Sequence, residues 1–190
     1  RFGAAWRAQH DLNVVGVTGS NGKTTLKELI AACLSRQGPT LATHGNLNND
    51  IGMPLMLTRI EDRHRFAVIE MGANHVGEIA YLTALARPDI VVITNAGAAH
   101  LEGFGSLEGV AHAKAEIIEG LADDGIFVCH GDDKWLPLWC ELAGERSVTT
   151  FGAGEQCDVR LLTETVDSRW EADGFHQRFS YSSHGEQHVA

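Results

Sequence analysis

The first candidate for chemistry is a glycine-rich segment with a lysine and two threonines, Thr18-Gly19-Ser20-Asn21-Gly22-Lys23-Thr24-Thr25. In such a loop, glycines let backbone N–H groups face an anion, and the following helix and the lysine add positive potential. The hydroxyl after the lysine, here on Thr24, is the group that binds Mg²⁺. The glycine spacing is shorter than in the common motif, because Val17 stands where that motif begins with glycine. We predict that residues Gly19 to Thr25 bind a nucleotide; the alternative is a plain strand-to-helix turn.

An acidic residue ends a second apolar run, Phe66-Ala67-Val68-Ile69-Glu70, and Met71-Gly72 then turns the chain away. In P-loop enzymes an acid at the carboxyl end of a neighbouring buried strand completes the metal site. The alternative is an acid that caps the next loop. Because a P-loop candidate precedes it, we interpret Glu70 as a Mg²⁺ ligand.

Two polar loops add further candidates. The loop after an expected strand at 90–94 contains His100, whose neutral ring nitrogen could bind a metal, although a loop histidine is more often solvated or hydrogen-bonded. A second loop carries Asn46, Asn48 and Asn49, whose amides can donate to and accept from a polar substrate. The alternative for this loop is a simple turn, since Asn and Gly are favoured in turns.

One lysine lies where an apolar residue is expected. In the helical pattern at 106–121, Lys114 shares the inner stripe with Leu107, Val110, Ile117 and Leu121. A desolvated lysine has a lowered pKa and more of its neutral amine. Such an amine can react with carbon dioxide to form an anionic carbamate that binds a metal. The alternative is an internal salt bridge, with Glu116 or a loop acid as partner, and the residues alone favour neither.

Apolar, β-rich runs alternate with helical patterns through the first two-thirds of the chain. Strands are expected at 13–17, 40–43, 66–70, 90–94, 125–129 and 147–151, and helices at 24–36, 77–86, 106–121 and 134–143. This alternation predicts an α/β fold with a P-loop-type, mostly parallel sheet covered by helices on both faces. Ligands of such sheets bind beyond the carboxyl ends of the strands. In the helix at 24–36 the expected buried face comprises Leu26, Leu29, Ile30, Cys33 and Leu34.

The last forty residues have a different pattern, typical of short antiparallel strands. These strands are expected at 158–162, 169–172 and 175–181, with Asp173-Gly174 as a two-residue hairpin loop and His184-Gly185 as a further turn. We therefore predict a small C-terminal antiparallel β-sheet attached to the α/β core.

Composition excludes several classes of protein. The chain has 190 residues, 44% of them hydrophobic, and a formal net charge of −10, which argues against nucleic-acid binding through a basic surface. No apolar run reaches transmembrane length and no signal-peptide pattern opens the chain, so we expect no membrane insertion. Four widely spaced cysteines predict free thiols in a reducing cytoplasm. We expect a cytoplasmic monomer.

Together these motifs resemble the Mur ligases, ATP-dependent amide-forming enzymes of bacterial cell-wall synthesis. The nucleotide loop at 18–25 matches theirs, including the short glycine spacing. The segments 46–52, 70–79 and 100–105 resemble the branch that joins D-alanyl-D-alanine to a UDP-N-acetylmuramoyl-tripeptide. The resemblance extends from about Trp6 to the end of the chain and is most specific over 14–118.

The resemblance implies a role for each candidate residue. Lys23 would contact the phosphates of ATP, and Thr24 and Glu70 would bind Mg²⁺. His100 would bind a second Mg²⁺, and Lys114 matches a lysine that is carbamylated in relatives. The loop with Asn46, Asn48 and Asn49 would face the muramoyl-peptide substrate.

The implied reaction has two steps. ATP phosphorylates the terminal carboxylate of the tripeptide and leaves as ADP, and the amine of D-alanyl-D-alanine then attacks the acyl phosphate, which gives the amide and releases phosphate. The family also has an N-terminal UDP-binding domain and a C-terminal amine-substrate domain, which we do not find in residues 1–190. We therefore expect a central ATP-binding domain with little or no ligase activity alone. A switch GTPase would need an Asn-Lys-x-Asp motif, which the sequence lacks. A non-catalytic nucleotide-binding or scaffold module remains the alternative.

Overall fold

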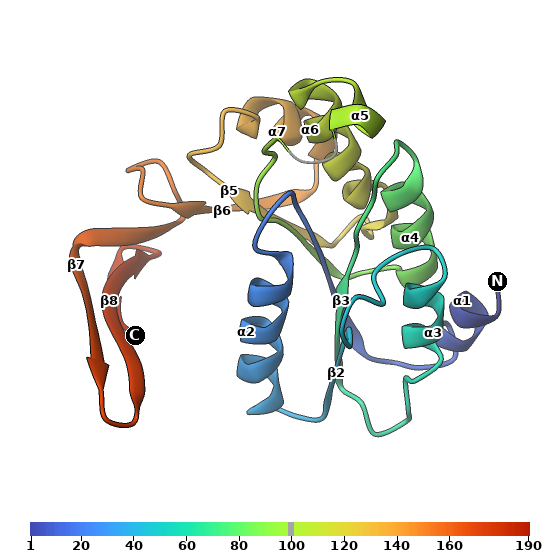
Figure 1. Ribbon diagram of the computed structural model, residues 1–190, viewed down its shortest axis with the longest axis horizontal. Helices are drawn as coiled ribbons and strands as arrows, with labels where there is room; N and C mark the ends of the chain where they lie inside the picture. Colours follow the sequence, from blue (N-terminus) through green and yellow to red (C-terminus); the bar gives the residue numbers. More distant parts are fainter. Residues whose placement is uncertain (99–100) are drawn as a thin grey trace.

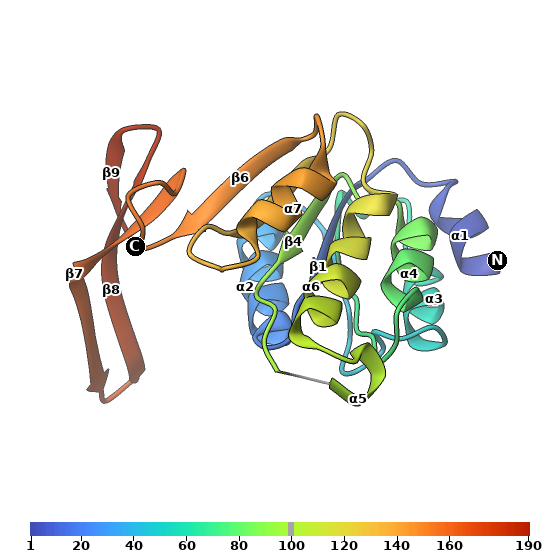
Figure 2. The same ribbon diagram turned by 90° about the horizontal axis from the view of Figure 1, so that it is seen from above.

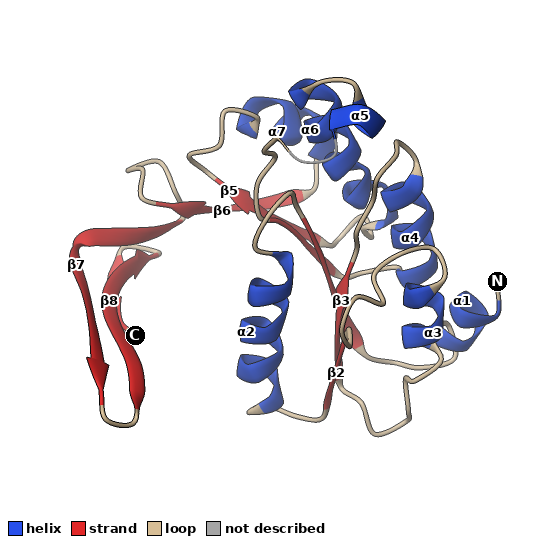
Figure 3. Cartoon of the chain, in the orientation of Figure 1, coloured by secondary structure: helices blue, strands red, loops and turns tan. Residues whose placement is uncertain are grey.

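The computed structural model describes residues 1–98 and 101–190, and its centre is one nine-stranded sheet (Figures 1 and 3). The strand order is β2-β3-β1-β4-β5-β6-β7-β8-β9. The strands are β1 Asn13–Thr18, β2 Thr40–Ala42, β3 Phe66–Glu70, β4 Ile90–Ile93, β5 Ile126–His130, β6 Ser147–Gly152, β7 Val159–Glu171, β8 Gly174–Ser183 and β9 Glu186–Val189. Strands β1 to β6 pair in parallel, as the alternation of strands and helices predicts.

Helices cover both faces of the parallel part of the sheet, which confirms the α/β prediction. The helices are α1 Phe2–Arg7, α2 Lys23–Ser35, α3 Gly52–Leu57, α4 Glu78–Ala86, α5 Leu101–Phe104, α6 Leu107–Ala115, the 3-10 helix η1 Glu116–Gly120, and α7 Leu136–Ala143. Figure 2 shows α2 on one side of β1 and β4, and α4 and α6 on the other. In that part of the chain which the structure describes, no helix is long and apolar enough to cross a membrane.

The two faces of the sheet bury two separate apolar clusters, because successive side chains of a strand point to opposite faces. In β1, Val14 belongs to the larger cluster, under α3, α4, α6 and α7, and Val15 and Val17 belong to the smaller cluster under α2. Gly16 faces the larger cluster, where a side chain would meet Met71 and Ile117 at 3.3–3.4 Å. The near-continuous apolar character of β1 therefore follows from burial on both faces.

The prediction for the buried face of α2 is partly wrong. Leu26, Ile30 and Leu34 pack against the sheet as expected, but Leu29 is 60% exposed and Cys33 is exposed. The fully buried positions are instead Lys27 and Ala31. Hydrophobicity alone assigned Leu29 to the core, whereas the helix turns a stripe centred on positions 27 and 31 toward the sheet.

The helix expected at 106–121 is two helices in the structure. Ser106 caps the N-terminus of α6, because its Oγ accepts a hydrogen bond of 3.0 Å from the N–H of Gly109. The helix continues to Ala115 and then tightens into η1. The inner stripe is nevertheless preserved: Val110, Lys114 and Ile117 are all buried.

The C-terminal antiparallel strands are present, but they extend the main sheet. β7 pairs in parallel with β6 only at Val159 and Arg160, and it pairs antiparallel with β8 from Val159 to Glu171. The short strands expected at 158–162 and 169–172 are one strand, β7, with a register shift between Leu162 and Asp167. Both faces of this ribbon are exposed over most of its length, so its polar residues do not end the strand. β7 and β8 project from the core as an arm (Figure 1).

Both C-terminal turns occur near the expected positions. The first loop is Ala172-Asp173, one residue earlier than predicted, because Gly174 already pairs with Glu171 as the first residue of β8. The second turn is at His184-Gly185 as predicted, and both residues have positive φ, 52° and 81°. Positive φ at both central positions matches the right-handed twist of the flanking strands in a two-residue hairpin.

Candidate functional site

The predicted phosphate-binding loop connects the carboxyl end of β1 to the N-terminus of α2. Gly19 has φ 144° and Gly22, the N-cap of α2, has φ 79°, conformations that favour glycine. A side chain at Gly19 would also overlap the hydroxyl of Thr94, whereas nothing lies within 4 Å of a Cβ built at Gly22. The glycines of the motif are therefore needed for backbone shape, and Gly19 for a close approach as well.

Residues after β4 brace this loop from the neighbouring strand. Thr94 Oγ1 donates to the carbonyl of Asn21 at 2.7 Å, and Asn95 Oδ1 accepts from the N–H of Asn21 at 3.1 Å. Ser20 Oγ donates to the carbonyl of Gly97 at 3.1 Å and accepts from its N–H at 3.0 Å. Sequence reasoning missed Thr94 and Asn95; the available signal was a polar pair directly after an apolar strand.

The lysine of the loop is folded back onto it. Lys23 Nζ donates to the carbonyls of Gly19 at 2.7 Å and Ser20 at 3.3 Å. Burial lowers the pKa of Lys23, and the charge of Glu70 opposes that shift. The cation thus lies at the centre of the loop, close to the carboxylate that the sequence predicted beside it.

Glu70 ends β3, which pairs in parallel with β1, so both strands deliver their last residues to the same edge of the sheet. The side chain of Glu70 is 2% exposed. Its Oε2 accepts a hydrogen bond of 2.9 Å from Thr24 Oγ1, and its Oε1 accepts one of 2.7 Å from Asn48 Nδ2. The structure therefore brings Lys23, Thr24 and Glu70 together.

These oxygens fit a magnesium ion. Mg²⁺ prefers oxygen ligands in an octahedron at about 2.1 Å, and neighbouring ligands of such an octahedron are then about 3 Å apart. Thr24 Oγ1 and Glu70 Oε2 lie 2.9 Å apart. When bound, the ion would neutralise negative charge on a phosphate, and this pair of side chains would hold it.

The three asparagines of the second loop have different surroundings. Asn46 is exposed, and Asn49 uses its side-chain oxygen to accept from the N–H of Gly52 at 2.8 Å, at the start of α3. Asn48 is half-buried and its amide is bonded to Glu70. Substrate binding by these residues stays a prediction, but Asn48 already belongs to the Glu70 cluster.

Lys114 is buried, as its place on the inner stripe predicted, with 2% exposure. Burial, reinforced by the charge of Lys23, lowers its pKa to about 8, and Glu116 and Glu78 oppose the shift. Its Nζ lies 5.2 Å from the centre of the Phe104 ring. Carbamylation of Lys114 stays a prediction, and the low pKa supplies the neutral amine that it requires.

The alternative role of Lys114, an ion pair with Glu116, is not what the structure shows. Glu116 accepts hydrogen bonds from the N–H groups of Gly77 at 2.7 Å and Ala80 at 3.2 Å, at the N-terminus of α4. Within residues 1–98 and 101–190, Lys114 forms no ion pair. His100, the predicted second metal ligand, lies outside the described residues.

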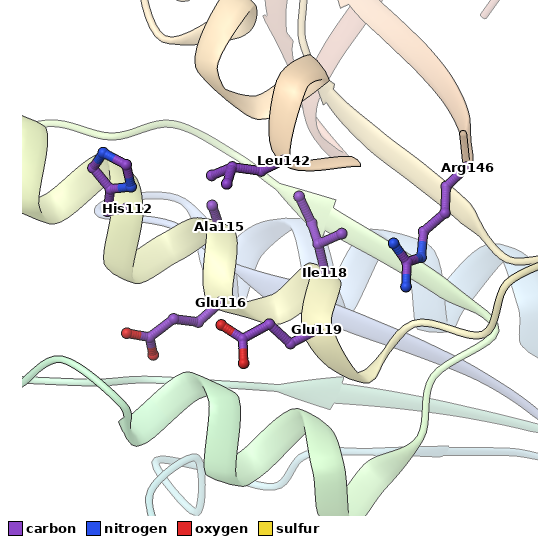
Figure 4. Close-up of a pocket in the computed structure, with 7 residues that line it drawn as sticks. All are labelled: His112, Ala115, Glu116, Ile118, Glu119, Leu142 and Arg146. Carbon is purple, nitrogen blue, oxygen red and sulfur yellow. The ribbon is translucent and has the colours of Figure 1, made fainter. Parts of the chain in front are cut away.

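A surface pocket between α6, η1 and α7 is a separate feature (Figure 4). Its charged side chains do not converge: the guanidinium of Arg146 lies on the opposite side of Ile118 from the carboxylates of Glu116 and Glu119. Because Glu116 is engaged at the start of α4, we assign no chemistry to this pocket. All four cysteines are free, as predicted, and burial raises the pKa of Cys129 to about 12.

The fold and the loop define a P-loop-type α/β domain with an acid at the neighbouring strand end. Residues 17–188 match the family model of the Mur ligase middle domain, and the chain belongs to the Mur ligase family.

Individual relatives agree with this assignment. The chain is 53% identical over 150 residues to UDP-N-acetylmuramoyl-tripeptide–D-alanyl-D-alanine ligase of Escherichia coli (strain K12), an alignment that covers 78% of this chain and 33% of the relative. It is 45% identical over 148 residues to the enzyme of the same name from Bacillus subtilis (strain 168), covering 78% and 32%. The chain thus spans about a third of the length of these relatives.

Solved structures show the same fold. A crystal structure of MurF from Acinetobacter baumannii superimposes with a TM-score of 0.90 at 36% identity, over 100% of this chain and 40% of that one. MurF ligase from Thermotoga maritima, solved in complex with ADP, gives a TM-score of 0.84 at 33% identity, over 99% and 42%. The mostly parallel sheet and its antiparallel extension are therefore those of solved family members.

Proposed function

We propose that this chain is the ATP-binding middle domain of a ligase that joins D-alanyl-D-alanine to a UDP-N-acetylmuramoyl-tripeptide in peptidoglycan precursor synthesis. The observation that supports it most is the cluster of Lys23, Thr24 and Glu70 at the carboxyl ends of β1 and β3. The relatives that carry this name, and the neighbour solved with ADP, support the choice of reaction and nucleotide.

Within this proposal, each group acts on the charge of the triphosphate. Lys23 exchanges the carbonyls of Gly19 and Ser20 for phosphate oxygens, and the N–H groups at the start of α2 stabilise the same anion. Thr24 and Glu70 hold Mg²⁺, which supplies charge neutralisation. Screening of this charge lets the substrate carboxylate approach a phosphate.

The UDP-linked substrate and D-alanyl-D-alanine would be bound largely by parts of the relatives that this chain does not match. We propose accordingly that the chain binds ATP but ligates little or nothing alone. We also propose that it acts in the cytoplasm and as a monomer.

The first test is titration of the chain with ATP and Mg²⁺ by isothermal calorimetry, for wild type and Lys23→Ala. Loss of a charged hydrogen-bond donor should weaken binding about 10- to 100-fold. Arg63→Ala is the control. Arg63 is an exposed cation in the turn before β3, so it lies at the amino ends of the strands, away from the proposed site at their carboxyl ends. Equal affinities of wild type and Lys23→Ala would contradict the proposed nucleotide site.

The second test concerns the reaction and uses the full-length protein. We expect amide formation with UDP-N-acetylmuramoyl-tripeptide and D-alanyl-D-alanine, measured as phosphate release and product mass. Single amino acids serve as competing acceptors. A preference for a single amino acid over the dipeptide would reject this branch of the family, and ATP binding without any ligation would favour a non-catalytic module.

A further inference from the structure

The side-chain amide of Asn48 lies against the carboxylate that we propose as a metal ligand. Its Nδ2 donates to Glu70 Oε1 at 2.7 Å, while Oε2 of the same carboxylate faces Thr24. An ionised carboxylate only accepts hydrogen bonds, so the donor end of the amide must face Glu70. The two oxygens of Glu70 therefore have different partners, one an amide and one a hydroxyl that can itself ligate a cation.

The backbone of Asn48 is fixed by two hydrogen bonds. The backbone carbonyl of Asn48 accepts a hydrogen bond of 2.8 Å from the backbone N–H of Gly72, and the backbone N–H of Asn48 donates one of 2.8 Å to the backbone carbonyl of Asn46. A Cβ built at Gly72 would lie only 3.1–3.2 Å from the side-chain amide of Asn48. The absence of a side chain at Gly72 is thus what lets the amide lie beside the end of β3.

The loop that carries Asn48 is attached to the strand and helix of the site. Thr43 Oγ1 accepts from the backbone N–H of Glu70 at 2.9 Å, and the carbonyl of Thr43 accepts from Lys27 Nζ at 2.7 Å. Lys27 and Thr43 are each 1% exposed. Lys27 lies one helical turn after Lys23. Through Thr43 and Asn48, hydrogen bonds therefore connect α2, the loop that carries Asn48, and Glu70.

We propose that Asn48 is a positioning residue for the Glu70 carboxylate: its amide occupies Oε1 and thereby directs Oε2 toward the divalent cation next to Thr24. This inference rests on the proposed function, because it concerns the metal site of the nucleotide. Hydrogen bonds to a ligating carboxylate orient it, and their loss typically lowers metal affinity about 10- to 100-fold. Contact between Asn48 and the muramoyl-peptide is not needed for this role.

The test compares the affinity for ADP with and without Mg²⁺, by calorimetry, for wild type and Asn48→Leu. Leucine has nearly the shape of asparagine but donates no hydrogen bond. We expect metal-free ADP affinity to be unchanged and the gain in affinity from Mg²⁺ to fall about tenfold or more. Mn²⁺ binding in the presence of ADP, followed by electron paramagnetic resonance, should weaken in parallel. The matched control is Gln37→Leu, an exposed amide after the C-terminus of α2, which should change neither affinity.

A double-mutant cycle separates positioning from a structural role. If Asn48 acts through Glu70, Asn48→Leu should not reduce the effect of Mg²⁺ further in a Glu70→Gln background. Asn48→Ser, which is too short to reach Glu70, is measured in the same way should Asn48→Leu fold poorly. Equal weakening of ADP binding with and without Mg²⁺, or additive effects of the two substitutions, would overturn the inference. Wild type that binds neither ADP nor Mn²⁺ would overturn the proposed function as well.

Discussion

Most buried charges near the loop between β1 and α2 are stabilised by hydrogen bonds to neutral groups. Lys23 donates to two backbone carbonyls, Lys27 donates to the carbonyl of Thr43 as well as to Glu28, and Glu70 accepts from a hydroxyl and an amide. Lys114 differs, because its amine forms no ion pair among the described residues and lies 5.2 Å from the centre of the Phe104 ring. A cation at this position costs free energy, and its lowered pKa reflects that cost.

The burial of Lys114 leads to a prediction about pH and stability. Its pKa is about 8 in the folded chain against an ordinary value of 10.5, so the unfolded chain binds more protons between these values and stability rises with pH across them. Lys114→Met removes the buried cation and should raise the free energy of unfolding at about pH 7 by up to about 3 kcal/mol. The stability advantage of Lys114→Met over wild type should shrink toward about pH 10, where the Lys114 amine of folded wild type is deprotonated.

Urea unfolding in carbonate-free buffer at the two pH values measures this difference. Lys134→Met is the matched control, because Lys134 is exposed and lies over the ring of Trp135. A Lys114→Met protein that is less stable than wild type at neutral pH would show that the amine is better stabilised than burial indicates.

At the scale of elements, α2 has two tasks that constrain its sequence. Its first turn presents Lys23 and Thr24 to the site, and its body covers the sheet face formed by Val15, Val17 and neighbouring residues. Lys27 serves both tasks, since it is buried on this face and binds Thr43. The polar residue within the stripe explains why the apolar pattern alone misplaced Leu29.

A pair of neighbouring alanines tests the orientation of α2. Ala31 is 8% exposed and faces the sheet, whereas Ala32 is exposed. Ala31→Leu should destabilise the chain by about 1–3 kcal/mol through overpacking. Ala32→Leu should stay within about 0.5 kcal/mol of wild type, because alanine and leucine have similar helix propensities. Urea unfolding measures the stability of both variants. Equal effects would mean that the face of α2 centred on positions 27 and 31 is not the one that packs against the sheet.

At the scale of the whole molecule, the core and the arm differ in how they are stabilised. The central strands β1, β3 and β4 bury side chains on both faces, whereas β7 beyond Leu162 and the paired segment 174–178 of β8 are mostly exposed. At the end of this ribbon the ring centroids of Trp170 and Phe175 are 5.2 Å apart, yet Trp170 remains 80% exposed. A two-stranded ribbon of this kind is only marginally stable by itself.

Hydrogen exchange should reveal this difference. We expect amides in residues 163–178 to exchange well before those of β1 and β4, because opening the arm exposes little apolar surface. Peptides from β5, which is closer to the arm but buried in the sheet, serve as the internal control in mass spectrometry. Equal protection of the arm and β1 would indicate that the chain unfolds only as one unit.

Local residue patterns predicted the parts of the fold that depend on local chemistry. Apolar runs located the six parallel strands to within a residue or two, and the glycines and lysine at 19–23 located the loop between β1 and α2. The errors share one cause: a pattern does not report which neighbour covers a surface. Leu29 is exposed because nothing in the described structure packs on that side of α2, and β7 is continuous because β8 supplies its hydrogen bonds.

The sequence by itself determined the fold class, the loop and the presence of a carboxylate at the end of β3, since each follows from residue types within a short stretch of chain. Only the tertiary structure decided that Thr24 and Asn48 bind opposite oxygens of Glu70, and that Thr94 and Asn95 brace the loop. Those contacts join residues 22 to 74 positions apart. They arise from the order in which parallel strands pair, which places distant strand ends at one edge of the sheet.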